Sequence, residues 1–184
     1  MNEIRHPAAM IGIPLYLAAS HIHDYVLQAD GAFDETVRGI LKLKAVGQQV
    51  EIRVVVHRQN AGLPALAEFI GRNLAFVDHV IFMGLEMTGF AKANILDLWI
   101  DPVDYQHELY EAASLVDDLG LRTSIYDHQL CAVNPRVRSL AAQSISDWKN
   151  EYIDECESCI LRSSCGGFFA TGRVRRSDHI KAIL

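Results

Sequence analysis

Residues 50–57, with the sequence VEIRVVVH, form the clearest β-strand pattern in the chain. Their β-branched side chains suit the pleated, half-buried surface of a sheet. Three further strands are predicted, at residues 11–19, 78–85 and 121–126. Because Pro14 has no N–H to give to a sheet ladder, the strand at 11–19 is expected to lie at an edge of the sheet.

Stretches with helical periodicity separate these strands. Helices are predicted at residues 34–46, 63–74 and 101–119, with a polar loop at 20–25 and a long connection at 86–94. Alternation of strands with helices of this length favours parallel strands joined by right-handed crossovers. The predicted fold class is therefore α/β, with about four parallel strands.

The composition narrows the class of protein. The chain has 184 residues, 50% of them hydrophobic, and a formal net charge of -6. A general nucleic-acid-binding protein would be basic, and no apolar run reaches the length of a membrane span, so neither nucleic acid nor membrane is an expected partner. The first residues lack the charged-then-apolar pattern of an export signal, so the protein is expected to be cytoplasmic.

All four cysteines fall in the last third of the chain: Cys131, Cys156, Cys159 and Cys165, with the spacing C-x24-C-x2-C-x5-C. Four thiolates are the ligand set of a tetrahedral zinc ion or of a four-iron cluster, and spacing alone does not separate the two. Two disulfides or four buried thiols are the alternatives, but disulfides are typical of secreted chains. Residues 129–184 are therefore predicted to form a small cysteine-rich extension that binds a metal or a cluster.

Polar side chains follow each predicted strand at its carboxyl end. They are Ser20, His21, His23, Asp24, His57, Arg58, Asn60, Glu86, Thr88, Asn94, Asp127 and His128. Ligands of parallel α/β folds bind outside these strand ends, so together the residues predict one pocket. Any one of them alone is more simply explained as a helix cap or a solvated loop residue. No Gly-x-Gly-x-x-Gly motif or phosphate loop is present, so nothing supports a nucleotide site.

A cysteine hydrolase site is an alternative interpretation of the residues at this end of the sheet. Cys131 is close in sequence to His128 and Asp127, and these are the residue types of a cysteine hydrolase. Neighbours in sequence need not meet in space, and such a site would leave the other three cysteines unexplained. The shared metal site is therefore the favoured interpretation.

Several stretches resemble the second half of a radical SAM barrel, namely residues 13–16 (IPLY), 31–36 (GAFDET) and 51–56 (EIRVVV). Residues 83–94 (MGLEMTGFAKAN), residues 144–150 (SISDWKN) and the cysteine block narrow the match. Together they resemble the radical SAM maturases of the His-Xaa-Ser peptide-modification systems. The resemblance covers nearly the whole chain from about residue 11.

The resemblance implies the ligands of each site. The four cysteines would bind an auxiliary four-iron, four-sulfur (4Fe–4S) cluster, with Zn²⁺ as the alternative. S-adenosylmethionine would lie over the strand ends, where His57, Asn60, Glu86 and Asn94 would face the cofactor or the peptide substrate. The resemblance indicates no catalytic residue.

The chain departs from the family at one point. Radical SAM enzymes hold the cluster that cleaves their cofactor in a Cys-x3-Cys-x2-Cys loop, and no cysteine precedes Cys131. Residues 1–128 are therefore expected to be a partial barrel that lacks this half. Such a chain would be inactive alone and would bind S-adenosylmethionine only if the missing half were supplied. The strand at 11–19 would be unpaired, and it is expected to pair with a second copy or with a partner maturase subunit.

Two functions of different classes follow. The first is a fragment of a maturase that modifies a His-Xaa-Ser-type peptide and carries an auxiliary cluster. The alternative is a non-catalytic peptide-binding or scaffold protein with a structural four-cysteine zinc site.

Overall fold

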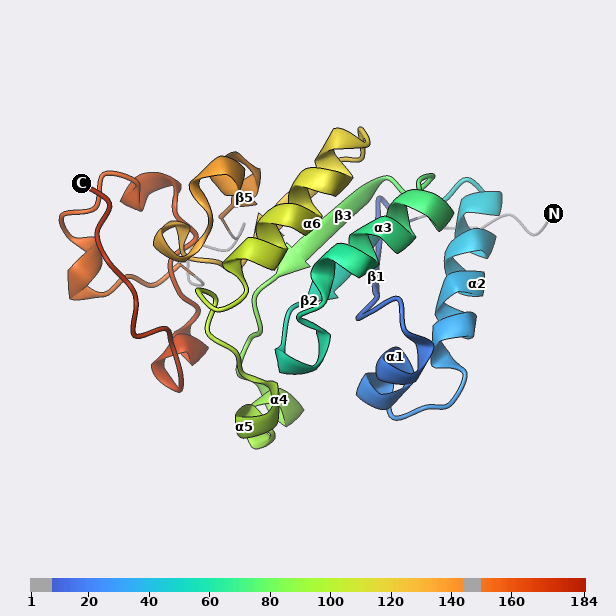
Figure 1. Cartoon of the computed structure of the whole chain (residues 1–184), viewed down its shortest axis with the longest axis horizontal. Helices are drawn as coiled ribbons and strands as arrows, with labels where there is room; N and C mark the ends of the chain where they lie inside the picture. The colour runs from blue at the N-terminus through green and yellow to red at the C-terminus, as the bar shows by residue number, and fades with distance from the viewer. Residues whose placement is uncertain (1–7, 144–149) are drawn as a thin grey trace.

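The computed structural model of the chain describes residues 8–143 and 150–184, which form an α/β fold. Its five-stranded sheet is parallel, and the strand order follows the chain, β1-β2-β3-β4-β5 (Figure 1). The strands are β1 Ile11–Pro14, β2 Val50–Val55, β3 His79–Met83, β4 Thr123–Tyr126 and β5 Ala141–Ala142. The helices are α1 Ser20–Leu27, α2 Ala32–Ala45, α3 Leu63–Asn73, α4 Gly89–Ala93, α5 Ile95–Leu98 and α6 Gln106–Asp118. The short 3₁₀ helices used below are η1 Arg58–Asn60, η2 Leu130–Ala132, η3 Pro135–Leu140, η5 Asp154–Cys156, η6 Arg162–Ser164 and η7 Ala170–Arg173.

The predicted parallel α/β class is confirmed, and all of the predicted strands are present. The two-residue β5 was not predicted, because Ala141 and Ala142 carry no strand signal of their own. The family-like stretch at 144–149 lies outside the described residues.

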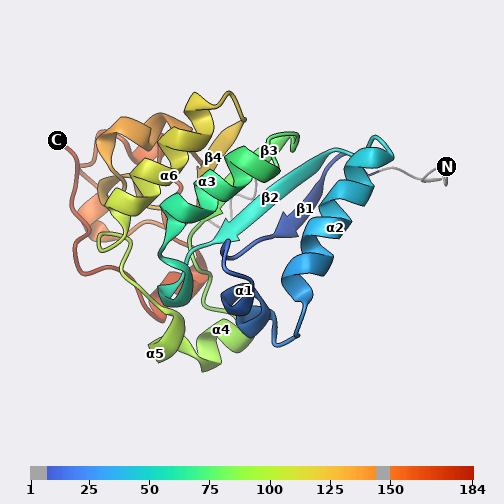
Figure 2. The ribbon, with the colours of Figure 1, turned by 45° about the vertical axis from the view of Figure 1, so that its right-hand side comes forward.

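Strand β1 forms one edge of the sheet, beside β2 (Figure 2). Among the described residues it pairs with β2 alone, and Leu15, just after it, donates its N–H to the Arg53 carbonyl at 3.0 Å. Backbone groups alternate in direction along a strand, so position 14 faces away from β2. Pro14 therefore stands where its missing N–H breaks no ladder bond, and its predicted edge position is confirmed.

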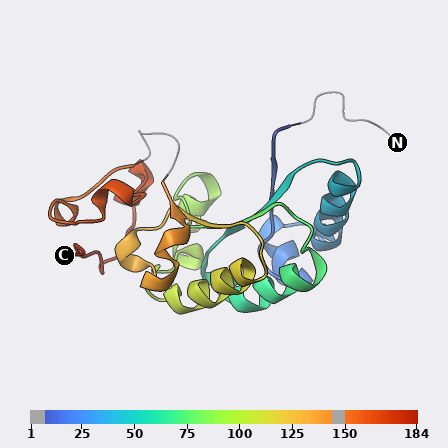
Figure 3. The same cartoon turned by 90° about the horizontal axis from the view of Figure 1, so that it is seen from above.

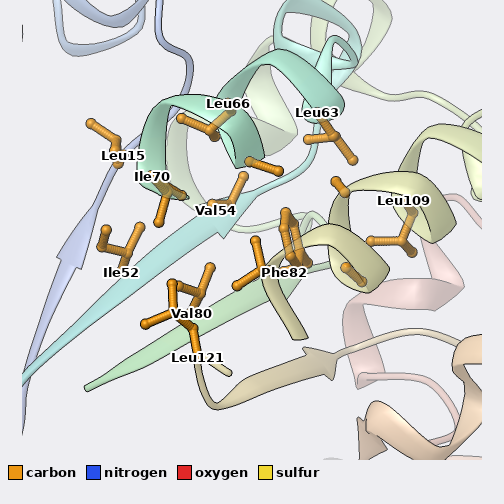
Figure 4. Packing of buried hydrophobic residues seen from close by; sticks show 14 of the residues in the cluster. Leu15, Ile52, Val54, Leu63, Leu66, Ile70, Val80, Phe82, Leu109 and Leu121 are labelled. Carbon is orange, nitrogen blue, oxygen red and sulfur yellow. The ribbon is translucent and has the colours of Figure 1, made fainter. Parts of the chain in front are cut away.

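The apolar core lies between one face of the sheet and the helices α3 and α6, which pack side by side (Figure 3). Figure 4 shows Val54, Val80 and Phe82 of the sheet together with Leu66 of α3 and Leu109 of α6. All five side chains are fully buried. Burying a side chain of this size contributes roughly 1.5–3 kcal/mol. Apolar burial is therefore the chief force that holds the sheet and its helices together.

The alternate residues of the same strands place polar groups on the opposite face. Arg53 donates from Nε to Glu51 Oε1 at 2.6 Å, and His79 Nε2 lies 2.9 Å from Ser124 Oγ. Glu51 and His79, which approach to 3.6 Å, are both buried. A parallel sheet covered on both faces is normally apolar on both. A polar second face and a sequential strand order are instead what a segment of a barrel, with a lined interior, would present.

Residues 20–25, which were predicted as a polar loop, belong to helix α1. His23 in this helix is completely buried: its Nδ1 accepts from Tyr16 N at 3.3 Å and its Nε2 lies 3.2 Å from Thr36 Oγ1. The prediction was wrong because it treated this histidine as a solvent-facing residue. One backbone N–H and one side-chain hydroxyl as partners allow a neutral imidazole to replace an apolar residue in the packing.

Further departures concern the helices between β3 and β4. The helix predicted at 101–119 begins at Gln106, because Asp101 accepts from Val103 N at 3.0 Å and closes a turn instead. The connection at 86–94 contains the short helix α4. None of the helices in the described ranges is both long and apolar enough to cross a membrane.

Candidate functional site

The four cysteines line one small cavity in the C-terminal extension, drawn orange to red in Figure 1. We call it the cysteine cavity; its volume is about 20 Å³, and Tyr152, Phe168 and Ile180 also line it. The cysteines come from three parts of the chain: Cys131 lies in the 3₁₀ helix η2, Cys156 ends η5 with Cys159 three residues later, and Cys165 follows η6. The structure thus brings together four thiols whose first and last members stand far apart in the sequence.

All four thiols are free, so the disulfide alternative is not realised. Backbone N–H groups point at three of the sulfurs, those of Cys131, Cys159 and Cys165. Leu130 N and Gly167 N lie 3.4 and 3.5 Å from Cys165 Sγ, and Ile183 N lies 3.4 Å from Cys159 Sγ. Donors of this kind stabilise a thiolate, the form of cysteine that binds metals, and they tune the potential of iron–sulfur clusters.

Gly167 holds a position that few other residues could occupy. Its φ is 62°, and a Cβ there would collide with the Glu151 carbonyl. The close approach follows from the bridge between Glu151 and Phe168, which exchange two backbone hydrogen bonds of 2.7 Å. A glycine therefore lets the chain turn behind Cys165 and directs the Gly167 N–H at the sulfur.

The donor set fits an iron–sulfur cluster or a zinc ion, because four thiols and their N–H donors suit either. The cysteine side chains do not stand in the positions of ligands around one metal ion. In the described ranges, no three His, Cys, Asp or Glu side chains stand close enough together to hold one metal ion. A cavity of about 20 Å³ would also need outward movement of the cysteine side chains to admit a cluster. Either ligand would therefore draw the side chains into a new arrangement.

The surroundings of the Cys131 thiol change its pKa. Burial raises its pKa, and the neighbouring thiols of Cys165 and Cys156 raise it further, whereas a hydrogen bond from the Lys181 backbone lowers it. A metal must displace the thiol proton, so loading of this site should release protons.

A larger cavity lies at the carboxyl ends of β1, β2 and β3, between α1 and the pair α4–α5. We call it the strand-end cavity; its volume is about 740 Å³. Of the four predicted cofactor-binding residues, His57 and Asn94 line it, whereas Asn60 and Glu86 do not. Two of the four therefore line a cavity at the strand ends, where the sequence predicted a pocket, and their binding of a cofactor stays a prediction.

Asn60 is completely buried, and its side chain forms hydrogen bonds with backbone groups of the chain. Its Oδ1 accepts from His57 N at 2.7 Å, and its Nδ2 donates to Val55 O at 2.8 Å and to Tyr16 O at 3.1 Å. These bonds tie the ends of β1 and β2 together through η1. A cofactor role for Asn60 or Glu86 therefore depends on the family resemblance alone.

His57 has an unusual environment. Its Nδ1 accepts from Gln59 N at 3.2 Å, which places the ring proton of the neutral form on Nε2. That Nε2 is buried and has no hydrogen-bond partner. Burial lowers the pKa of His57 to about 4, so the ring is neutral at pH 7.

A third hollow, of about 70 Å³, lies between the ends of β3 and β4 and the extension. Asp127 there has a φ of 62°, and a Cβ on Gly84 would collide with its carbonyl. The Arg175 guanidinium lies 4.2 Å from the ring centre of Trp99, a cation–π contact. Asp127 was among the strand-end residues predicted from the sequence, but Trp99 was missed because nothing in the pattern links residue 99 to residue 175.

The structure argues against a cysteine hydrolase site, because His128 is not placed to act as the general base for Cys131. His128 Nδ1 lies 2.7 Å from the Tyr126 carbonyl, and Nε2 lies 2.8 Å from the Tyr105 hydroxyl. Both ring nitrogens are thus engaged away from Cys131. Complete burial lowers the pKa of His128 to about 4 and raises that of Tyr105. The pair is a buried structural contact.

No protein-family model matches the chain, and no curated protein is similar to it at a significant level. Among solved structures, the chain is similar to a domain of pyruvate-formate lyase-activating enzyme from Bacteroides vulgatus, with a TM-score of 0.46 and 12% sequence identity. The match covers 64% of this chain and 66% of that one, slightly less than two thirds of its length.

Proposed function

We propose that this chain is the second half of a radical SAM-type barrel and that its extension binds an auxiliary 4Fe–4S cluster through Cys131, Cys156, Cys159 and Cys165. The observation that supports this most is the cysteine cavity, where four thiols from three parts of the chain meet. The N–H donors to Cys159 and Cys165 favour the thiolate form that a cluster needs. The polar inner face of the sheet and the sequential strand order support the barrel part.

The position of the cysteine cavity suits a working cluster. Its lining shares Gln129, Gly167 and Phe168 with the hollow at the ends of β3 and β4. A bound cluster would supply one-electron chemistry. The chain's own residues would fix its place against the strand ends, where ligands of parallel α/β folds bind.

The finer role is modification of a peptide of the His-Xaa-Ser type. It rests on the sequence resemblance, supported by an open cavity at the strand ends where a peptide could enter. Cleavage of S-adenosylmethionine would require a Cys-x3-Cys-x2-Cys loop, which a partner would supply. The outer edge of β1, which pairs with no other described strand, is the proposed contact for that partner, since the Gly12 N–H and the Gly12 and Pro14 carbonyls face away from β2.

The test is anaerobic reconstitution of the purified chain with iron and sulfide. We expect about four irons and four sulfides per chain with absorption near 400 nm, the signature of a thiolate-bound cluster. The same protein with S-adenosylmethionine and a strong reductant should form no 5′-deoxyadenosine, because four cysteines leave no iron open to the cofactor. Robust turnover by the chain alone, or iron that binds without sulfide, would overturn the proposal.

A structural zinc site is the second candidate, and the small volume of the cysteine cavity favours it. The chain would then be a non-catalytic peptide-binding or scaffold protein. Stoichiometric zinc in protein purified without oxygen, with no colour after reconstitution, would select this function.

A further inference from the structure

We propose that the strand-end cavity binds a neutral, largely apolar amide, whose apolar group fills the cavity and whose carbonyl accepts a hydrogen bond from His57 Nε2. This inference deepens the proposed function, because it specifies which residue of a peptide the strand ends would take. It uses none of the residues that line the cysteine cavity.

The cavity wall is mainly apolar and aromatic. Tyr16, Tyr25, Leu27, Leu85, Phe90 and Leu98 line it. Phe90 is 89% exposed and Tyr25 is 60% exposed, so two large rings at its mouth stand in water. A volume of about 740 Å³ is within the range of small-ligand sites and would admit an aromatic amino-acid residue with its flanking amides. An apolar occupant would cover both rings.

His57 supplies the single polar requirement. Its Nε2 carries a proton and has neither a protein partner nor contact with solvent. A buried N–H left without an acceptor costs about 1–3 kcal/mol. The Tyr16 ring, whose centre lies 5.6 Å from that of His57, lines the same cavity. A modest shift of Tyr16 would open the nitrogen to a ligand carbonyl, which would recover the missing hydrogen bond.

The charges of the wall indicate a neutral ligand. Of the described residues that line the cavity, none is lysine or arginine, and Asp97 is the one that carries a charge at pH 7. A carboxylate or phosphate would face Asp97 with no cation to compensate it. A carbonyl needs only a hydrogen-bond donor, and His57 is that donor.

The experiment follows chemical shifts of the full chain in NMR titrations with three probes. N-acetyl-L-phenylalaninamide has the ring, the carbonyls and no charge, whereas N-acetyl-L-phenylalanine adds a carboxylate and N-acetylglycinamide lacks the ring. We expect saturable binding of the first, with shifts at residues of the cavity, and affinities at least about 10-fold weaker for the other two. Equal affinity for the anionic probe, or no saturable binding of the neutral one, would overturn the inference.

Matched variants locate the site. Phe90→Ala removes a wall ring and should weaken binding about 10-fold, whereas Leu96→Ala removes an equally exposed apolar side chain outside the wall and should change affinity less than about twofold. His57→Gln keeps an amide donor near Nε2, and His57→Asn keeps only the acceptor for Gln59 N. The Gln variant should retain binding, and the Asn variant should lose about 10-fold.

Equal effects of Phe90→Ala and Leu96→Ala would contradict the site even if either histidine variant fails to fold. The assay needs no cluster, so the two proposals can fail separately. Probe binding without cluster assembly would overturn the proposed function alone. Cluster assembly without probe binding would overturn this inference alone.

Discussion

The sheet region and the cysteine extension are held together by different forces. The core of the sheet region consists of fully buried side chains from β2, β3, α3 and α6. Among the described residues after position 150, Phe168 is the one apolar side chain that is buried. The described secondary structure of that segment consists of single 3₁₀ turns and the isolated bridge between Glu151 and Phe168, and sulfur atoms accept backbone hydrogen bonds from Gly167, Lys181 and Ile183.

This difference identifies what each region requires to fold. A region with a large apolar core gains most of its stability from burial. A short segment with almost no core depends on cross-links or a bound metal, as small domains generally do. We therefore expect the sheet to fold without metal and the segment from 150 to 184 to order only when the four cysteines are ligated.

The largest expected effect comes from breaking the ligand set. Cys159→Ser keeps an acceptor for the Ile183 N–H but removes a soft metal ligand. It should abolish metal binding and remove stabilisation of the extension on the order of 10 kcal/mol, the figure for structural zinc. Metal analysis and limited proteolysis would show cleavage confined to the extension, while the exposed neighbour Ser158→Ala should behave as wild type. Full metal content in Cys159→Ser would contradict a shared site.

The next largest effect is expected in the apolar core of the sheet region. Phe82→Ala empties a fully buried position between the sheet and its helices and should cost about 3–5 kcal/mol of unfolding free energy. Metal content per folded chain should not change. Phe76→Ala, at a partly exposed position, is the control and should cost far less. Urea denaturation measures both, and equal losses would argue against the core as described.

A smaller loss is expected at the junction of β1 and β2. Asn60→Ala would leave the His57 N–H and the carbonyls of Tyr16 and Val55 without their bonds, at a cost of roughly 2–4 kcal/mol. Asn73→Ala removes one exposed bond to Phe69 O and should cost little. Denaturation curves that match for the two variants would show that Asn60 is not a buried anchor.

The smallest effect depends on pH. The buried His128 has a folded pKa of about 4, below its ordinary value near 6.5. The unfolded chain binds the proton first, so this stability is complete above about pH 6.5 and is lost as pH falls toward 4. By pH 5 the sheet region should lose about 2 kcal/mol through this group. His128→Phe should flatten the slope of unfolding free energy against pH, and an unchanged slope would exclude His128 as its source.

The sequence predicted the features that follow from local periodicity, and it missed the polar side chains whose burial depends on contacts with distant elements. Strand and helix periodicity located the parallel sheet, and Pro14 indicated its edge, because both are local properties. The four cysteines were recognisable as a group because they cluster in the last third of the chain, and the structure brings them to one cavity, while their metal binding stays a prediction. Asn60 was expected to face a cofactor or a peptide and His23 to lie in a polar loop, and both are completely buried. Their partners lie on other elements, so no local pattern reveals that these polar groups are satisfied.

The central claim is that ligation of the cysteines, and not burial, orders the extension. Hydrogen exchange of the chain with its metal or cluster bound, and again after chelation, tests it most directly. We predict that removal speeds exchange in residues 150–184, and at the Leu130, Gly167 and Ile183 amides that face sulfur, by roughly a thousandfold. The amides of α3 and β3 should exchange as before. Equal protection of the extension in both states would contradict the account.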